Sequence, residues 1–157
     1  MTSDFPTAAE RRLLDAAIAQ AEKSWREGGI PIGAALGDES GTVLAVGHNL
    51  RVQTGDPTAH AEVVCIRSAG RRRDWKRLTL ATTLSPCVMC TGTALLLRIP
   101  RIVIGENRTF LGGEDLLRER GVSIALADDE RCITMMKRMQ RERADVWAED
   151  IGDPDET

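Results

Sequence analysis

Hydrophobic residues recur at helical spacing near the start of the chain. Between residues 7 and 27 an apolar side chain returns every three or four positions, which predicts an amphipathic helix. These apolar residues are Leu13, Leu14, Ala17, Ile18, Ala21 and Trp25. Thr7 and Glu10 have the spacing of a capping box for the first turn. Gly28 and Gly29, followed by Pro31, predict where the helix ends.

Short apolar runs alternate with helical segments along the rest of the chain. The runs that predict strands cover residues 31–36, 42–47, 78–84, 101–105 and 122–127. The segments that predict helices cover 59–69, 114–120 and 128–140, with a loop over 50–58. A further helix is expected to start at Ser85 as N-cap and Pro86 as first helical residue. This order predicts an α/β protein, a three-layer α/β/α sandwich whose mixed five-stranded sheet is mostly parallel.

Composition narrows the class of protein. A chain of 157 residues with 42% hydrophobic residues and a net charge of −3 is expected to form one domain over 1–157. The last segment, 144–152, is expected to be a short helix. No apolar run is long enough to span a bilayer, and the first residues lack a signal-peptide pattern. We therefore expect a cytoplasmic protein whose four cysteines are reduced.

Two short stretches carry the candidate chemistry, His60-Ala61-Glu62 and Pro86-Cys87-Val88-Met89-Cys90. One imidazole and two thiols are a ligand set that suits Zn²⁺, and three protein ligands leave one position open for a water molecule. Glu62 remains as a carboxylate that can exchange protons with that water. The pattern H-x-E followed by P-C-x-x-C is the signature of zinc nucleobase deaminases.

Each of these residues also has a plainer interpretation. The two cysteines at 87 and 90 could form a structural zinc knuckle or a redox pair, and the chain could be a zinc-binding module without activity. Cys65 and Cys132 are more typical of small buried residues than of ligands. His48 is expected to be structural because the ligand set is complete without it. Phe110 and Trp147 could belong to the core or to a pocket for a ring.

The chain resembles the cytidine-deaminase fold and, within it, the fungal-type cytosine deaminases. The similarity runs from Glu10 to Gly152 and includes the two zinc stretches. It also includes Glu27-Gly28-Gly29-Ile30-Pro31-Ile32-Gly33, Gly47-His48-Asn49, Thr82-Thr83-Leu84-Ser85-Pro86-Cys87, Cys90-Thr91-Gly92, Gly105-Glu106-Asn107, Asp128-Asp129-Glu130-Arg131-Cys132 and Trp147-Ala148-Glu149-Asp150-Ile151-Gly152. The last of these stretches is the one that indicates the cytosine deaminase branch.

The resemblance implies a role for each matching residue. His60, Cys87 and Cys90 would hold Zn²⁺, and Glu62 would shuttle protons. Asn49 would pair with the N–H and carbonyl edge of a heterocyclic base, assisted by the backbone N–H of Ala61. The Ser85 carbonyl and Asp150 would receive the amine, and Ile32, Phe110 and Trp147 would form walls around the ring. The segment 144–152 would then close over the base as a lid. Two departures are that Ala61 stands where those enzymes have glycine, and that residues 51–57 differ.

Several functions stay open at this point. The first is hydrolytic deamination of a free base, such as cytosine, an azacytosine or an aminotriazine, with release of ammonia. An aminopurine base such as guanine or isoguanine is an alternative. Another is editing of tRNA or other nucleic acid through the basic segment 71–77, although the negative net charge and the acidic tail disfavour it. The resemblance and the apolar stretch 94–99 also predict a homodimer.

Overall fold

The computed structural model describes residues 2–153, so the acidic tail residues Asp155 and Glu156 lie outside the described residues. The helices are α1 (Ala8–Arg26), α2 (Arg51–Thr54), α3 (Ala61–Ala69), α4 (Val88–Leu97), α5 (Glu114–Glu119), α6 (Glu130–Glu142) and α7 (Ala144–Ile151). The strands are β1 (Gly33–Gly37), β2 (Val43–His48), β3 (Thr79–Leu84), β4 (Arg101–Glu106) and β5 (Ser123–Leu126), and a 3₁₀ turn spans Trp75–Arg77. Within the described part, no helix combines the length and apolarity needed to cross a membrane.

One mixed sheet of five strands, in the order β2-β1-β3-β4-β5, forms the middle layer. The pairs β1–β2 and β1–β3 are antiparallel, whereas β3–β4 and β4–β5 are parallel. The prediction of a mixed five-stranded sheet is confirmed, but the prediction that it is mostly parallel is wrong. The reason is that β1 runs against both of its neighbours, because the hairpin enters the sheet beside β3 rather than at the end of a crossover.

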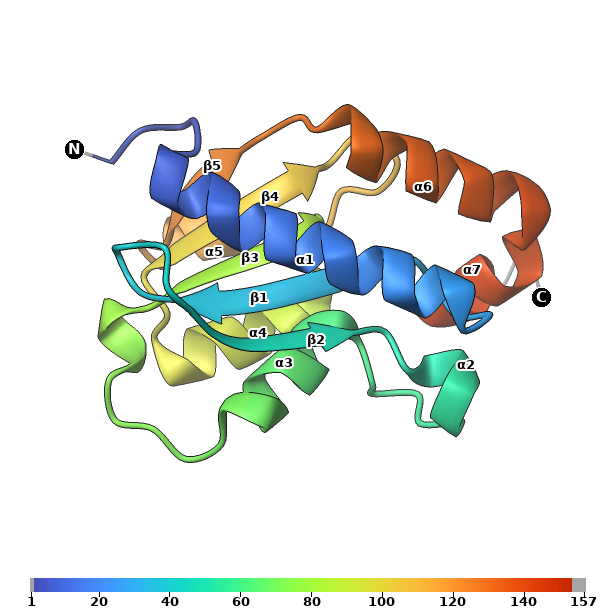
Figure 1. The fold of residues 1–157 in the computed structure, drawn as a ribbon, viewed down its shortest axis with the longest axis horizontal. Helices are drawn as coiled ribbons and strands as arrows, with labels where there is room; N and C mark the ends of the chain where they lie inside the picture. Colours follow the sequence, from blue (N-terminus) through green and yellow to red (C-terminus); the bar gives the residue numbers. More distant parts are fainter. Residues whose placement is uncertain (1, 154–157) are drawn as a thin grey trace.

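The helices cover both faces of the sheet, so the three-layer sandwich is confirmed (Figure 1). Alternate residues of neighbouring strands form two rows across the sheet, one on each face. One row packs against α3, α4 and α5 and consists of Leu36, Leu80, Ile102 and Ile124. The smaller residues of the other row lie under α1 and α6 and are Ala35, Ala81, Val103 and Ala125. Burial of both rows is the main apolar contribution to folding.

Helix α1 begins and ends as the sequence predicts. Thr7 Oγ1 accepts from the N–H of Glu10 and the Glu10 carboxylate accepts from the N–H of Thr7, so the capping box is present. The same carboxylate pairs with the guanidinium of Arg101 at 2.7 Å, which ties the first turn of α1 to the start of β4. At the other end Gly28 has a φ of +85°, a conformation that glycine adopts without strain.

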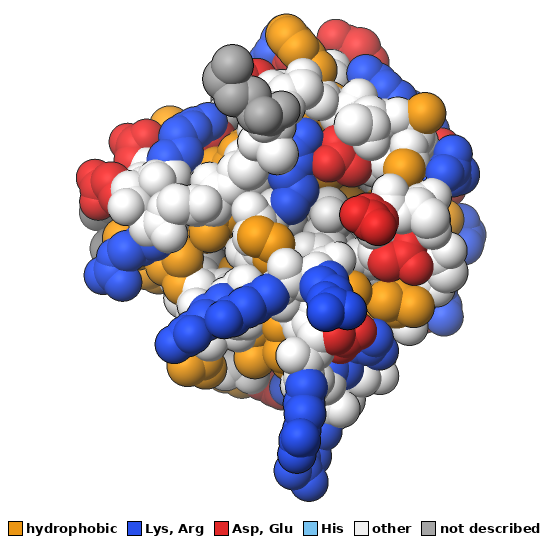
Figure 2. Space-filling view, turned by 90° about the vertical axis from the view of Figure 1, so that its left-hand side faces the viewer, with side chains coloured by type: hydrophobic (Ala, Val, Ile, Leu, Met, Phe, Trp, Pro, Cys, Tyr) orange, Lys and Arg blue, Asp and Glu red, His pale blue; other side chains and the backbone are white. Residues whose placement is uncertain are grey.

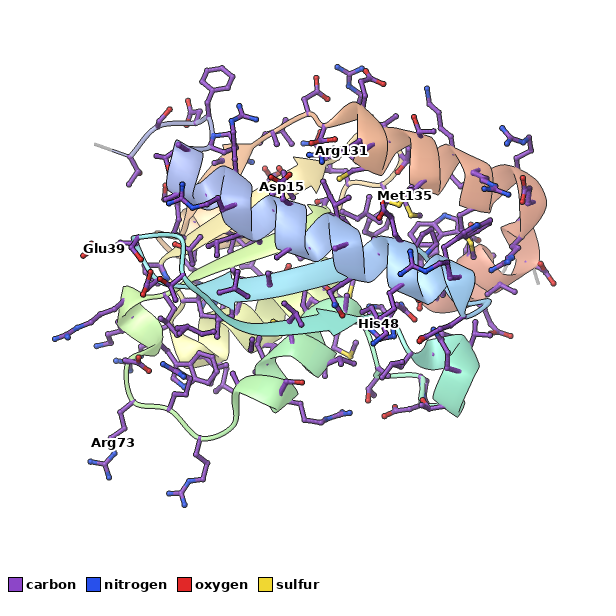
Figure 3. All side chains as sticks on the ribbon, in the orientation of Figure 1. Asp15, Glu39, His48, Arg73, Arg131 and Met135 are labelled. Atoms are coloured by element: carbon purple, nitrogen blue, oxygen red, sulfur yellow. The ribbon has the colours of Figure 1, made fainter. Side chains whose placement is uncertain are left out.

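Ties between elements fix the positions of α3 and α6. A side chain at Gly47 would meet the backbone nitrogen of Cys65 at 2.4 Å, so the glycine lets α3 pack closely on β2. Across the other face, Arg131 of α6 pairs with Asp15 of α1 at 2.9 Å, and Figure 3 shows the two side chains next to each other. On α6, Met136 and Met139 are buried, whereas Met135 is only half-buried.

Three local predictions need correction. Ser85 is not a helix N-cap: Cys87 takes that place, because the Ser85 N–H still pairs with Glu106 O at the strand end and its hydroxyl binds a side chain elsewhere. The helix predicted over 128–140 begins at Glu130, with Asp129 as its N-cap. The segment expected as a loop over 50–58 contains the short helix α2, whose single turn carries too few residues to show a hydrophobic period.

Candidate active site

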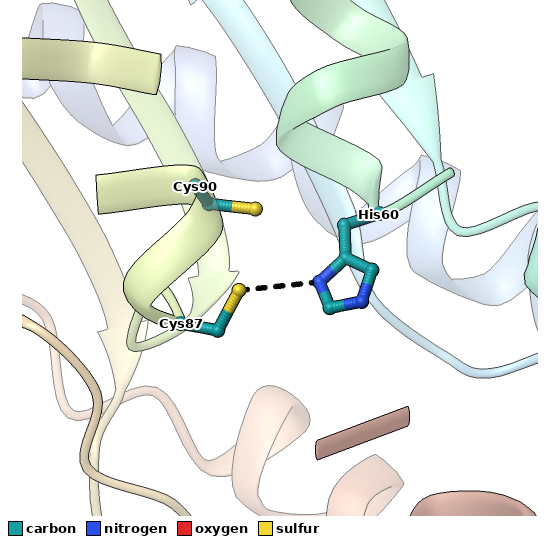
Figure 4. Close-up of side chains that lie close together, drawn as sticks. All are labelled: His60, Cys87 and Cys90. Carbon is teal, nitrogen blue, oxygen red and sulfur yellow. Dashed lines mark hydrogen bonds between the residues drawn. The ribbon is translucent and has the colours of Figure 1, made fainter. Parts of the chain in front are cut away.

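The predicted metal ligands lie at the N-terminal ends of two helices on the same side of the sheet. His60 is the N-cap of α3, Cys87 is the N-cap of α4, and Cys90 lies in the first turn of α4. Strand β3 ends at Leu84, directly before the turn that leads to Cys87. Figure 4 shows the three side chains pointing toward one another from these two helices.

The geometry of the three ligand atoms fits a zinc ion. All three ligand atoms lie within 4.8 Å of one another, and the Cys87 sulfur lies 3.4 Å from Nδ1 of His60. Ligands of a tetrahedral Zn²⁺, at about 2.0–2.3 Å from the ion, are separated by roughly 3.3–3.8 Å. The donor set of one nitrogen and two sulfurs, with no fourth protein ligand in this cluster of described residues, is that of a catalytic rather than a structural zinc site.

The titration behaviour of the ligands reflects how closely they are packed. Hydrogen bonds from Cys90 and His60 lower the pKa of the Cys87 thiol to about 4, against the opposing effect of burial. The pKa of Cys90 is raised, first by its hydrogen bond to Cys87 and then by burial. Burial favours neutral His60, but its bonds to Asp150 and Cys87 raise its pKa to about 10. Before a metal binds, thiolate character is therefore favoured for Cys87 and disfavoured for Cys90, and metal binding must displace the other protons.

Glu62 is a buried carboxylate next to the ligand cluster. Its side chain is almost fully buried, with 3% exposure, and burial raises its pKa. One carboxylate oxygen accepts from the hydroxyl of Thr82 at 2.7 Å, and the other accepts from the Cys90 thiol at 3.2 Å. Thr82 also donates to Leu84 O, so its hydroxyl is shared between two acceptors. A carboxylate with a raised pKa in a closed site can hold and release a proton near neutral pH.

A small cavity opens beside Glu62 and brings the predicted site residues together. It is lined by Ile32, Asn49, His60, Ala61, Glu62, Leu84, Ser85, Cys87, Phe110, Trp147 and Asp150. Its volume is about 20 Å³, which is room for about one water molecule. An open groove of about 560 Å³ lies outside and shares His60, Cys87, Phe110 and Asp150 with the cavity. The residues shared between the two spaces separate the cavity from the surface.

Asp150 connects the ligand cluster to the residue expected to read the base. Its Oδ1 lies 3.3 Å from Nε2 of His60 and accepts from the side-chain amide of Asn49, also at 3.3 Å. Because His60 turns Nδ1 toward Cys87, its other ring nitrogen is free to bond Asp150. A carboxylate in this position orients a metal-binding histidine and fixes which nitrogen faces the metal.

Helix α7 closes one side of the cavity. Trp147 meets Phe110 edge to face, with ring centroids 5.7 Å apart. At the last turn of α7, Glu149 approaches Arg51 of α2 at 3.6 Å. The two sides of the entrance therefore touch each other through an aromatic pair and a charged pair.

Sequence reasoning missed several residues that shape the site. Thr82 and Leu84 stand in one of the stretches that carry the resemblance, and alternation places both side chains on one face of β3, but neither was given a role. Glu114, only 2% exposed, accepts from the Ser85 hydroxyl at 2.6 Å, and that hydroxyl accepts from the N–H of Gly112 at 2.9 Å. No sequence signal marks this bond, because it joins segments that are 29 residues apart.

His48, Cys65 and Cys132, which the sequence predicts to be structural, lie outside the ligand cluster. His48 bonds Glu27 at 2.7 Å and Gln20 at 3.1 Å, so it ties β2 to α1, and Figure 3 shows it at the end of β2. Cys65 and Cys132 are both buried, and burial raises their pKa values, the first to about 12. Neither belongs to the ligand cluster.

This fold and this site define a class, and comparison with known proteins agrees with it. Residues 7–106 match the family model described as cytidine and deoxycytidylate deaminase zinc-binding region. The chain belongs to this family of zinc-dependent deaminases, and His60, Cys87 and Cys90 form its zinc-binding triad. The interpretation as a zinc module without activity is thereby set aside.

Within that class, the chain is similar to the cytosine deaminase of Candida albicans. The two share 44% identity over 146 residues, which cover 92% of this chain and 97% of the relative. Among solved structures, one from a study of A-to-I editing by tRNA:A34 deaminases has a TM-score of 0.70 at 25% identity, covering 80% of this chain and 99% of that one. Guanine deaminase from Bacillus subtilis has a TM-score of 0.55 at 30% identity, covering 72% and 70%.

Proposed function

We propose that this protein hydrolyses the amino group of free cytosine, or of a closely related amino N-heterocycle, and releases ammonia. The observation that carries the proposal is the buried Glu62, which lies against the zinc-binding triad in a small cavity that also presents Asn49 and Asp150. The similarity to a cytosine deaminase extends over 92% of the chain.

Glu62 is the proton carrier of the proposed reaction. When bound, Zn²⁺ supplies the acidity that makes a water molecule nucleophilic at neutral pH. The carboxylate of Glu62 takes the proton released by that water and delivers it to the ring nitrogen beside the amine-bearing carbon. It then moves a proton to the departing nitrogen, which leaves as ammonia, while the water oxygen stays on the ring. Such a positioned acid and base contributes roughly 10²–10⁴ in rate.

The remaining cavity residues orient the base in this proposal. Asn49 and the backbone N–H of Ala61 hold the N–H and carbonyl edge, while Ser85 O and Asp150 receive the amine. Asp150 also keeps His60 aligned, as their 3.3 Å contact supports. Ile32, Phe110 and Trp147 enclose the ring. Each of these residues lines the same cavity.

The size of the cavity supports a lid that selects free bases. A volume of about 20 Å³ holds about one water molecule, so a base enters only when α7 and the segment with Phe110 move apart. After closure the ring is shielded from water, which strengthens the polar contacts around it. We propose that residues 144–152 are this lid and that a ribose does not fit under it.

Editing of tRNA is disfavoured by the position of the basic segment 71–77. This segment precedes β3, whereas Ser85 and the site follow it, and six strand residues span roughly 20 Å. Figure 3 shows Arg73 at the far end of the molecule from His48, which neighbours Asn49. That end faces the viewer in Figure 2, where Lys and Arg side chains project from the surface. Phosphates bound there would not lead a nucleotide toward Glu62.

An aminopurine substrate remains the second candidate, because a guanine deaminase is among the structural neighbours. Its larger ring system needs more room than a pyrimidine. The methyl group of Ala61, which is fully buried in the cavity wall, reduces the space further. Cytosine is therefore the better fit.

The assembly and location follow as parts of the same proposal. Helix α4 exposes Val88 and Leu96 at 78% and 81%, and exposed apolar groups of this kind mark contact surfaces. A second copy of this chain packed against α4 would cover them as a homodimer. The need for reduced Cys87 and Cys90 supports a reducing location such as the cytoplasm.

An ammonia-release screen on zinc-loaded protein tests the substrate. We expect release from cytosine and its free-base analogues, with cytidine and guanine slower by at least about tenfold, since each adds bulk that the closed cavity lacks. A Cys87→Ala sample is the control for ammonia formed without the metal site. Equal rates on cytosine and cytidine would show that α7 does not exclude the sugar.

A further inference from the structure

Arg143 occupies the corner where the chain turns from α6 into α7. It follows the last residue of α6 and precedes the first residue of α7, with φ −141° and ψ 50°. Its N–H bonds Met139 O at 2.8 Å, and its carbonyl accepts from the N–H of Trp147 at 3.1 Å. The backbone of this one residue therefore ends one helix and starts the helix that carries Trp147 and Asp150.

The side chain of Arg143 reaches to the end of α1. Its guanidinium lies 4.1 Å from the ring centroid of Trp25, and Nη1 donates to Gly29 O at 3.0 Å. Figure 1 shows this corner beside the C-terminal end of α1. A guanidinium that stacks on an aromatic ring and also donates a hydrogen bond is held in one orientation.

The segment after Gly29 leads directly into the other wall of the cavity. Ile32 lies three residues further on and lines the cavity. Its carbonyl accepts from the N–H of Asn49 at 3.0 Å, so the position of this segment also fixes Asn49. Arg143 thus contacts both the segment that carries one wall and the helix that carries the opposite wall.

The last turn of α7 is held separately, by Asp150 at His60 and Glu149 at Arg51. All four of these residues line the outer groove at the entrance. The contact of Arg143 lies at the opposite end of α7, away from the entrance, and can persist while the last turn moves. It therefore has the position of a fixed anchor about which α7 opens and closes.

We infer that Arg143 is a positioning residue for the deamination reaction: its bond to Gly29 O and its stacking on Trp25 set where α7 closes over the base. The inference rests on the proposed function, because it assigns the closed position of α7 to substrate binding. It concerns a residue outside the cavity, which touches neither the base nor the metal ligands.

Arg138 provides a matched control. Its guanidinium also lies over the Trp25 ring, at 4.6 Å from the centroid, and it pairs with Glu142 on the surface of α6. Arg138→Ala therefore removes a cation from the same ring without touching Gly29 O or the corner. Arg143→Lys keeps the charge near the ring but lacks the planar group that stacks and bonds at once.

The experiment measures KM and kcat for cytosine, together with hydrogen exchange of the α7 amides, on zinc-loaded full-length protein. We expect Arg143→Ala to raise KM and to speed α7 exchange by about tenfold, the effect of losing one charged hydrogen bond. Its kcat should stay within about threefold and its zinc content unchanged, because Glu62 and the triad are intact. Arg138→Ala should match the wild type, and Arg143→Lys should lie between.

The outcomes separate this inference from the proposed function. If Arg143→Ala equals Arg138→Ala in both KM and α7 exchange, the positioning role is wrong while the deaminase activity stands. If the wild type turns over no base, the proposed function fails. The hydrogen exchange of α7 then shows by itself whether Arg143 holds the helix in position. Where Arg143→Ala does not fold, Arg143→Lys is compared with Arg138→Lys by the same measurements.

Discussion

Glu62 shows what a single residue contributes here. A buried carboxylate is costly to desolvate, so a chain selected only for stability would place an apolar residue at this position. Thr82 and Cys90 offset part of that cost by donating to both oxygens. The two short stretches around His60 and Cys87 are enough to predict the metal ligands and Glu62 from sequence, because each stretch lies at the start of a helix. Thr82 carries no such signal, since its role depends on how β3 packs against α3.

A second single residue, Asp150, gives a prediction about zinc binding. Its contact with Nε2 of His60 is a polar contact of the kind that typically changes metal affinity by about 10–100-fold when lost. Asp150→Asn should therefore weaken zinc binding to that extent and also weaken binding of the base. Competition with a chelator measures the zinc affinity, and Cys87→Ala, which removes a ligand outright, marks the full loss. Unchanged zinc affinity in Asp150→Asn would show that His60 is oriented without it.

The elements were predicted best where a local pattern decides the outcome. Both ends of α1 follow from Thr7, Glu10 and the glycines after the helix, and the structure confirms them. The start of α4 was predicted wrongly because Ser85 is drawn into tertiary bonds with Glu106 and Glu114 instead of capping a helix. Propensity describes what a residue can do locally, and long-range partners decide what it does.

The first turn of α1 gives a prediction about stability. Burial works against ionised Glu10, but its bonds with Arg101 and Thr7 outweigh this and lower its pKa below 4.5. A lowered pKa in the folded state means stability that is present above about pH 4.5 and is lost as the pH falls through the folded value. Glu10→Gln should lower the free energy of unfolding at pH 7 by roughly 1–3 kcal/mol. Urea unfolding at several pH values measures this.

The difference between Glu10→Gln and wild type should shrink as the pH falls below about 4.5, because the wild-type carboxylate then becomes neutral as well. Glu130, an acidic residue in the first turn of α6, supplies a control as Glu130→Gln. A pH-independent difference for Glu10→Gln would mean that packing, rather than the charge pair with Arg101, is what the substitution removes.

Helix α7 gives a prediction about the lid. Trp147 packs edge to face on Phe110 and lines the cavity, but it does not touch the zinc-binding triad through any bond in the described structure. Trp147→Ala should lower kcat/KM for cytosine by roughly 10–100-fold, since the ring loses a wall and water enters the site. Zinc content should stay the same. Trp75, which lies within the basic segment 71–77 and does not line the cavity, supplies a control as Trp75→Phe.

At the scale of the whole molecule, the sheet decides which residues meet. The ligands, Glu62 and Ser85 follow strand ends on one side, whereas the basic segment 71–77 precedes β3 on the other. The alternation of strands and helices along the sequence predicts the three-layer sandwich. It also predicts that the site residues and the basic segment lie at opposite ends of the strands. It does not predict the direction of β1 against β3, which depends on how the hairpin joins the sheet. The closing contacts of α7 are likewise long-range and leave no local pattern.

The exposed apolar residues of α4 give a prediction at this scale. If a second copy covers Val88 and Leu96, the protein should sediment as a dimer at micromolar concentration. Leu96→Lys should shift it toward the monomer, because a charge would then be buried without a partner. Phe5, which is 71% exposed near the start of the chain, offers a matched surface substitution as Phe5→Lys. A wild-type monomer at that concentration would contradict the homodimer.

The most direct test of the central claim, that Glu62 carries protons for hydrolysis at the zinc-binding triad, is the turnover of cytosine by zinc-loaded wild type and Glu62→Gln. We expect the wild type to release ammonia from cytosine with about one zinc per chain. Glu62→Gln should keep the zinc and the fold while its kcat falls by roughly 10²–10⁴. A zinc-loaded wild type that leaves cytosine unchanged, or a Glu62→Gln variant with near-normal kcat, would contradict the account.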